Sequence, residues 1–194
     1  MTLGKRDLNG GVGPNEVAVD VSSTDGELLT STVIPDDGDT TASGKLGPLQ
    51  SQRVRVAGLA EGSYSIAIKG NNDFLIERLE VNQERLVVDR QISLAGGIYT
   101  KSPINPMTVY AATIPGDTLG AKTSHDEALQ KIMVVGSDTQ REVTVQTVGS
   151  WVQVPLTPGF YGIVAEKGDV TLSSGNTMFS FTPCSWFLPR VQQV

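Results

Sequence analysis

The feature that most constrains the fold is a pattern that occurs twice, once in each half of the chain. The segments RVRVAGLAEGSYSIAIKG and WVQVPLTPGFYGIVAEKG align with a single one-residue gap. The matched residues are Val54, Val56, Leu59, Gly62, Tyr64 and Ile66 in the first copy, and Val152, Val154, Leu156, Gly159, Tyr161 and Ile163 in the second. The offset is 98 residues for the first two pairs and 97 for the others, about the size of one small β-sandwich. The pattern therefore predicts two similar all-β modules in tandem.

Strand signals cover most of the chain. Apolar and polar residues alternate over Glu16–Val21, Arg53–Val56, Ser63–Ile68 and Glu142–Val148, as in strands with one buried face. Further β-like runs lie at Asp73–Val81, Arg85–Leu94, Met107–Ile114, Lys131–Val135 and Thr177–Phe181, separated by glycine-containing turns. We therefore predict an all-β fold of two tandem antiparallel β-sandwich modules, immunoglobulin-like or jelly-roll-like, with almost no helix.

Composition changes suggest where the modules begin and end. Residues 1–14 hold four glycines and few apolar side chains, which predicts an N-terminal arm that either extends freely or lies across a neighbour and orders on contact. The first module is expected over residues 15–97 and the second over 98–194, with Pro35–Gln50 as an exposed loop in the first. The one helix start signal is the capping box Ser124–Glu127, which predicts a single turn.

Charge and cysteine content exclude several classes of protein. The chain of 194 residues has 15 basic and 21 acidic residues, so its net charge of −6 opposes binding to nucleic acid or to an anionic membrane. Residues 1–97 carry nine basic and 14 acidic groups, whereas residues 98–194 carry six and seven. Cys184 is the only cysteine, which excludes an intrachain disulfide and a cysteine-based metal site. We find neither a signal peptide nor a run of apolar residues long enough for a membrane helix.

The repeated phrase L-x-x-G-x-Y-x-I resembles a strand-initiating pattern of immunoglobulin-like and fibronectin-like modules. The second half, from LQKIMVVG through PGFYGIVAEKGDVTLSSG, is also similar to β modules of surface and virion proteins. Tyr64 and Tyr161 hold matched positions in the two copies, which indicates a shared structural role. We expect each ring to pack under a sandwich corner with its hydroxyl bonded to the backbone.

Residues with catalytic or metal-binding chemistry are few. Ser124, His125 and Asp126 are adjacent in sequence, whereas a catalytic triad needs these groups to converge from separate parts of the fold. The acidic run Asp36–Asp39 offers oxygen ligands but lacks the spacing of a calcium-binding loop, so a solvated turn is the preferred interpretation. We predict no catalytic, cofactor-binding or metal-binding residues, although carboxylates that converge only in the fold would leave a hydrolase open.

Two tryptophans are the candidate contact residues. Trp151 and Trp186 are the candidates for a partner or glycan contact, because sugar-binding β-modules stack their ligands on exposed rings. We predict a non-enzymatic structural or interaction protein of a larger homo- or hetero-oligomeric assembly, located in a virion or an extracellular assembly. A decoration, adaptor or fibre-base component of a virion fits best. The alternative is a pair of accessory carbohydrate-binding modules of a secreted or cell-surface protein that bind polysaccharide.

Overall fold

The computed structural model describes residues 1–83, 85–96, 106–124 and 130–183. The described residues form β-strands and no helix, so no helix capable of crossing a membrane occurs among them. This confirms the predicted all-β class. The capping box at Ser124–Glu127 falls mostly on residues 125–129, which lie outside the described ranges. The chain divides into two compact units, Met1–Glu84 and Arg85–Val194.

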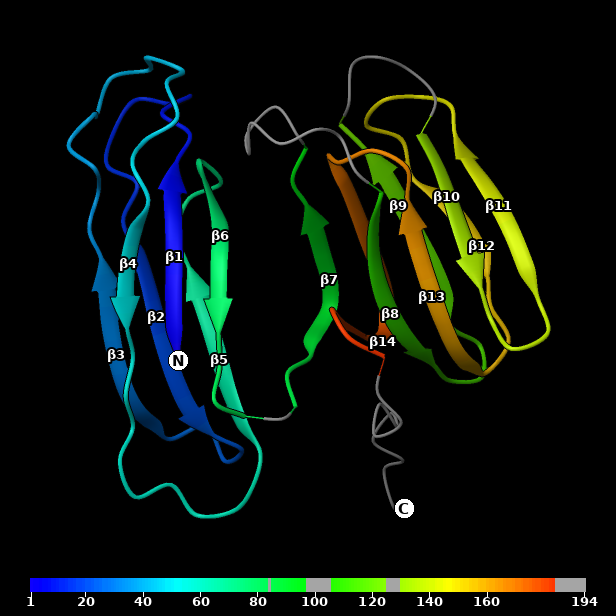
Figure 1. Ribbon diagram of the computed structural model, residues 1–194, viewed down its shortest axis with the longest axis horizontal. Coiled ribbons are helices and arrows are strands. Elements are labelled where there is room, and N and C mark those ends of the chain that lie inside the picture. Colours follow the sequence, from blue (N-terminus) through cyan, green and yellow to red (C-terminus); the bar gives the residue numbers. More distant parts are fainter. Residues whose placement is uncertain (84, 97–105, 125–129, 184–194) are drawn as a thin grey trace. The chain divides into compact units, whose positions relative to one another are not determined.

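The first unit contains two three-stranded antiparallel sheets, drawn in blue to green in Figure 1. Its strands are β1 (Thr2–Asp7), β2 (Val17–Ser23), β3 (Leu28–Ile34), β4 (Gln50–Arg53), β5 (Tyr64–Lys69) and β6 (Phe74–Glu80). One sheet has the order β4-β1-β6 and the other the order β3-β2-β5. Side chains alternate between the two faces of β2, so Val17, Val19 and Val21 all point to the same side. They pack in a core that also includes Leu3 and Ile34.

Residues 1–14 differ from the predicted arm. Thr2–Asp7 is the central strand of its sheet, paired with β4 on one side and with β6 on the other. The polar sequence TLGKRD does not predict a central strand, because it lacks the usual pattern of apolar residues. Lys5 and Asp7 are nevertheless fully buried, in positions that apolar residues usually take. The N-terminus is thus part of the first unit's core sheet rather than an arm.

The second unit contains one eight-stranded antiparallel sheet. Its strands are β7 (Val88–Leu94), β8 (Met107–Thr113), β9 (Thr118–Thr123), β10 (Gln130–Val135), β11 (Gln140–Val145), β12 (Val152–Pro155), β13 (Gly159–Ala165) and β14 (Val170–Ser180). The order is β11-β10-β13-β8-β14-β9-β12, and β7 pairs with β14. The buried side chains of these strands form one continuous core, of which Val109, Leu119, Ile163, Leu172 and Phe179 are members.

The long strand β14 bends this sheet into a nearly closed, barrel-like form (Figure 1). Its first part, Val170–Ser173, pairs with β7 and β9. Its last part, Met178–Ser180, pairs with β8 after a register shift. A strand that changes partner at an irregularity lets one sheet turn a corner, so both halves of the sheet face a common core.

The predicted division after residue 97 also differs from the observed one. β7 was expected in the first module, but it pairs with β14 of the second unit. The sequence echo therefore does not extend to the whole architecture: one unit has two three-stranded sheets, and the other has a single sheet of eight.

The echo marks the same kind of connection in both units. It covers the segments from β4 to β5 and from β12 to β13. Both predicted tyrosine bonds are present: the Tyr64 hydroxyl donates to the Ala60 carbonyl at 2.8 Å, and the Tyr161 hydroxyl donates to the Thr157 carbonyl at 2.9 Å. Each acceptor lies four residues before its tyrosine, so both connections are tyrosine corners. Tyr161 is buried, whereas Tyr64 is only half-buried.

Candidate functional site

Trp151 lies directly before β12 and its side chain is 44% exposed. Its ring contacts Gly120 of β9, where an added Cβ would lie 3.2 Å from the ring atom Cε3. The Lys122 ammonium lies over the ring, 5.1 Å from the centroid. The glycine thus makes room for the ring against the sheet, and the lysine adds a cation–π contact.

The sheet surface beside Trp151 is polar. Residues opposite one another in an antiparallel pair share a face, so the register places Gln153, Gly120, Ser173 and Gln91 in one row. The next row holds Lys122, Thr171 and Ser93. We call these residues, together with Trp151, the Trp151 face. An aromatic ring therefore stands among short hydroxyl and amide side chains that can donate and accept hydrogen bonds.

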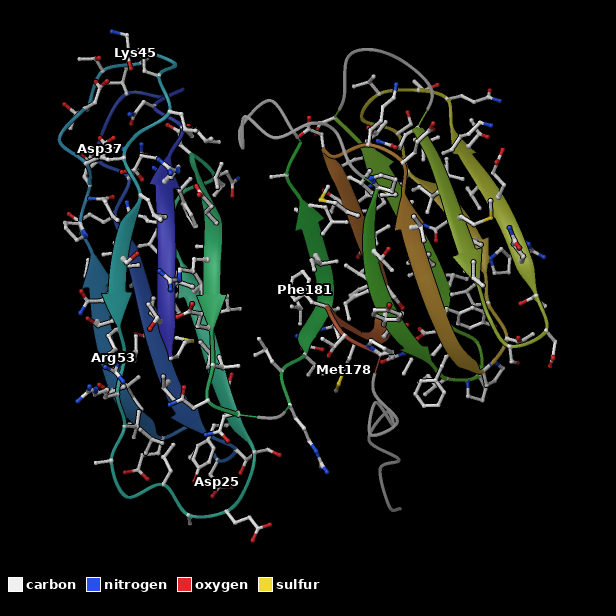
Figure 2. The ribbon with its side chains drawn as sticks, viewed as in Figure 1. Asp25, Asp37, Lys45, Arg53, Met178 and Phe181 are labelled. Atoms are coloured by element: carbon white, nitrogen blue, oxygen red, sulfur yellow. The ribbon has the colours of Figure 1, made fainter. Side chains whose placement is uncertain are left out.

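The other half of the same sheet presents a different outer surface. Phe160 of β13, which is 50% exposed, lies in a row with Ala112 and Met178. The next row holds Val135, Gly162 and Tyr110, flanked by Gln140 and Ser180, and the row after it holds Met133 and Val164, flanked by Glu142 and Thr108. We call this set the Phe160 face; Met178 is labelled on β14 in Figure 2. The second unit thus carries one polar outer face and one whose apolar centre is flanked by polar side chains.

Sequence reasoning did not single out the Phe160 face. Its residues on β13 and β10 occur in GFYGIVA and KIMVV, where both alternate positions are apolar. Such runs are typical of strands that are buried on both faces. The signal was therefore present in the sequence, but it predicted a fully buried strand as readily as an exposed apolar face.

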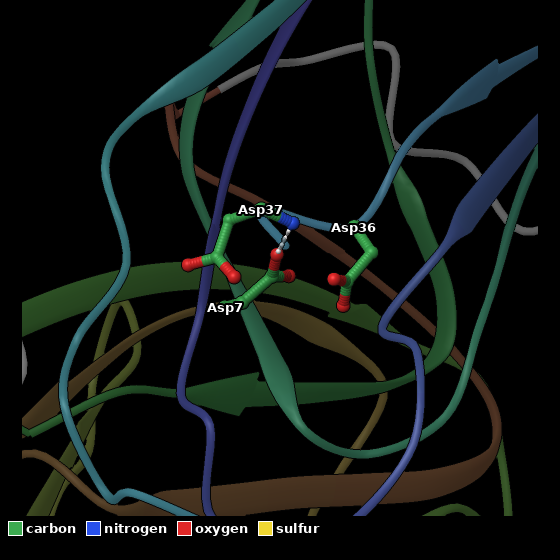
Figure 3. Close-up of side chains that lie close together, drawn as sticks. All are labelled: Asp7, Asp36 and Asp37. Carbon is green, nitrogen blue, oxygen red and sulfur yellow. Dashed lines mark hydrogen bonds between the residues drawn. The ribbon is translucent and has the colours of Figure 1, made fainter. Parts of the chain in front are cut away.

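A cluster of carboxylates lies at one end of the first unit. Asp7, Asp36 and Asp37 each offer an oxygen, and these three atoms lie within 4.8 Å of one another (Figure 3). Asp7 is buried and binds the equally buried Lys5, with 2.6 Å between Nζ and Oδ1. The Lys5 ammonium also donates to the Asn15 carbonyl. Lys5 therefore supplies a cation inside the cluster.

Hydrogen bonds occupy every oxygen of these three carboxylates. The second oxygen of Asp7 accepts from the Asp37 amide. The oxygens of Asp36 accept from the Asn15 and Gly38 amides. Those of Asp37 accept from Asn9 and from the Asp39 amide. The cluster thus has a structural explanation, because it ties the loop after β3 to the end of β1.

Asp39 forms hydrogen bonds within the same loop. Hydroxyl donors on Ser43 and Thr41, and then the Thr41 amide, hold the pKa of the Asp39 carboxyl below its usual value. Asp37 and Lys45, both labelled in Figure 2, mark this end of the unit. The predicted exposed loop at Pro35–Gln50 is therefore largely exposed, as expected, but internally bonded.

A small depression lies between the β10–β11 and β12–β13 loops. Its walls include Ser137, Asp138, Pro158, Phe160 and Tyr161. Asp138 is its only carboxylate, whereas glycoside hydrolysis of the usual kind needs a pair. This depression therefore offers no arrangement for that chemistry.

Four residues considered in the sequence lie outside the described ranges: His125, Asp126, Cys184 and Trp186. The structure thus describes one of the two candidate contact residues, Trp151. Comparisons with protein-family models, with curated proteins and with solved structures find no match to this chain.

Proposed function

We propose that this chain is a non-enzymatic binding protein whose second unit binds polysaccharide through the Trp151 face. The observation that carries the proposal is a 44% exposed tryptophan on a polar sheet surface. The C–H face of a sugar ring stacks on an aromatic ring, while sugar hydroxyls need nearby donors and acceptors. Gln153, Ser173 and Thr171 supply such groups beside the ring.

Lys122 narrows the proposed ligand class. Its ammonium lies over the indole and is the only cation among the residues that define the Trp151 face. A carboxylate on the sugar can form a charge-assisted hydrogen bond with this group. Polysaccharides that contain uronic acid are therefore expected to bind more tightly than neutral ones.

A fluorescence titration tests this proposal. Trp186→Phe leaves Trp151 as the sole indole, so the emission of that variant reports on the Trp151 face. We expect polygalacturonate to shift the emission, neutral xylan to shift it less, and Lys122→Ala to reduce the difference between the two. Trp151→Ala should abolish retardation of the chain in gels that contain the polysaccharide. Phe160→Ala, on the opposite face, is the matched aromatic control and should bind normally.

Two results would reject the proposal. One is the absence of binding to either polymer, and the other is retention of binding by Trp151→Ala. Loss of binding in both aromatic variants would also count against a localised site.

We infer that both units are β-sandwiches. Packing of the two three-stranded sheets of the first unit supports an immunoglobulin-like sandwich, because both contribute to one core. In the second unit, the groups β7-β14-β9-β12 and β11-β10-β13-β8 support a jelly roll. Jelly rolls occur in both lectins and viral capsids, so this analogy of fold is compatible with both functional proposals.

The second candidate function is a structural subunit of a larger assembly, such as a decoration, adaptor or fibre-base protein of a virion. The apolar centre of the Phe160 face favours it, because Phe160 and Val135 are exposed there and exposed apolar side chains are typical of protein contacts. Its partners would be other protein subunits. Light scattering over a concentration series should show a mass above 20.6 kDa that Phe160→Lys lowers and Trp151→Ala does not. A mass that Phe160→Lys leaves unchanged would argue against self-assembly through this face.

A further inference from the structure

The edge strand β3 of the first unit has one unpaired side. In the order β3-β2-β5 it pairs with β2 only, and no other described strand adds to it. Its backbone groups on the far side are therefore available to another strand. Val33 is 48% exposed and Ser31 is exposed as well, and β4 of the other sheet approaches part of this strand without pairing with it.

β3 lacks most of the features by which proteins usually protect sheet edges. Short strands, charged residues, prolines and bulges discourage edge pairing. Among the edge strands that the structure describes, the others each contain at least one charge or a proline: Arg53 in β4, Lys69 in β5, Glu77 in β6, Asp89 in β7, Arg141 in β11 and Pro155 in β12. β3 has the sequence LLTSTVI, with neither. Its one irregularity, a register shift opposite Leu29, leaves Thr30–Ile34 in regular pairing.

The sequence of β3 is chemically symmetric about Ser31. An antiparallel copy of the same strand, centred on this residue, would place Ser31 opposite Ser31, Thr30 opposite Thr32, and Leu29 opposite Val33. Each residue then meets one of its own chemical type. Such cross-strand pairs stabilise a sheet, and a two-fold axis requires this self-complementarity.

We propose that two copies of this chain pair antiparallel through β3, about a two-fold axis at Ser31, and so join their three-stranded sheets into one of six strands. The occupant of the β3 edge is therefore a second copy of the same strand. This contact goes beyond the proposed functions, because it uses neither the Trp151 face nor the Phe160 face.

Charge sets the conditions under which the pair forms. The first unit carries seven basic and 13 acidic residues, a net charge of −6. In the antiparallel pair, Glu27 before β3 lies near the end at which Asp36 and Asp37 follow β3 in the other copy. Like charges at both ends oppose association, and salt screens them. We therefore expect the dimer to strengthen as ionic strength rises.

Sedimentation velocity of the full chain at 50 and 500 mM salt tests the contact. We expect a concentration-dependent dimer that is more stable at high salt, and a monomer for Ser31→Lys, which places two ammonium groups face to face at the axis. The matched control is Ser51→Lys on β4, another exposed serine on an edge strand of the same unit. It makes the same change in charge and should still dimerise.

A cross-linking experiment gives a second measurement that needs no added charge. In Cys184→Ser chains, Ser31→Cys places two thiols across the axis, at the Cα separation of directly opposed residues, which suits a disulfide. Mild oxidation should yield a covalent dimer with Ser31→Cys and little with Ser51→Cys. A wild-type chain that stays monomeric at high salt would overturn the proposal. So would a dimer that survives Ser31→Lys, or equal cross-linking at the two positions. Polysaccharide binding by Ser31→Lys should be unchanged, which separates this test from that of the Trp151 face.

Discussion

Lys5 shows how one residue can determine the place of a whole strand. Its side chain and that of Asp7 are both fully buried, and the pair lies on β1, the central strand of its sheet. Burying two charges costs more free energy than burying apolar groups, so such a pair persists only when each charge is fully bonded. Here the ammonium reaches both Asp7 and the Asn15 carbonyl, and Asp7 also accepts from the Asp37 amide.

Lys5→Met should therefore destabilise the first unit strongly. The methionine keeps the volume of the lysine stem but leaves the Asp7 carboxylate buried without its counter-charge. Breaking a buried pair in this way costs about 3–5 kcal/mol. Urea unfolding measures the loss, and the double variant Lys5→Met/Asp7→Asn should recover part of it because no buried charge remains. A cost below about 1 kcal/mol for Lys5→Met would show that the pair does not carry this role.

Asp20 and Lys69 form a second ion pair, which is less buried than that of Lys5 and Asp7. The Lys69 ammonium and then the Ser31 hydroxyl hold the pKa of its carboxyl below the usual value. A depressed pKa means that the ionised carboxylate favours the folded state at neutral pH, and that this contribution is lost as pH falls through the folded-state pKa. Because the Lys69 side chain is largely exposed and Asp20 is only partly buried, solvent screens the ion pair and the contribution is small.

At the scale of elements, the tyrosine corners are where sequence and structure agree most closely. The two copies of L-x-x-G-x-Y-x-I lie at connections between strands that do not pair with each other. In the second unit the Tyr161 hydroxyl also meets the Thr157 hydroxyl, at 2.8 Å. The ring of Tyr161 joins the core, whereas that of Tyr64 does not.

Removal of the two hydroxyls should therefore have unequal effects. Tyr161→Phe loses a buried hydroxyl with two partners, and we expect it to lower the free energy of unfolding of the second unit by about 1–2 kcal/mol. Tyr64→Phe loses one bond at a half-exposed position, where water replaces the partner, so its cost should be about 0.5 kcal/mol or less. Thermal melts monitored by circular dichroism compare the two. Equal costs would contradict the assignment of different burial to the two corners.

Other elements could not be predicted from their sequences. β1 was missed because Lys5 and Asp7 interrupt its apolar pattern, and β9 (TLGAKT) because Gly120 replaces an outward side chain beneath Trp151. β3 was missed because threonine and serine fill its centre. The residues of β1 are explained by a buried ion pair, those of β9 by an aromatic ring and those of β3 by an unpaired sheet edge. Local periodicity explains none of these strands as well. The sequence alone identified Trp151 as a candidate contact residue. The polar face around it could not be predicted, because it depends on pairing between strands that are distant in the sequence.

At the scale of the whole molecule, the two units differ in net charge and each has its own hydrophobic core. The acidic excess falls entirely on the first unit, because Arg85–Val194 contains eight basic and eight acidic residues. The described core clusters draw on separate parts of the chain: one on residues of the first unit, the other on residues of the second. A neutral unit suits close contact with a ligand or a partner, whereas the acidic unit associates more readily when salt screens its charge.

Separate cores predict that the chain unfolds in two steps. If each unit is a cooperative domain, calorimetry of the intact chain should resolve two transitions. A loss of 1 kcal/mol shifts the midpoint of a domain of this size by roughly 4–8 °C, so Lys5→Met should lower one transition by more than about 10 °C and Tyr161→Phe should lower only the other. Each variant thereby serves as the control for its partner. A single transition that both variants lower together would mean that the two cores fold as one cooperative unit, and the division after Glu84 would then describe contacts rather than domains.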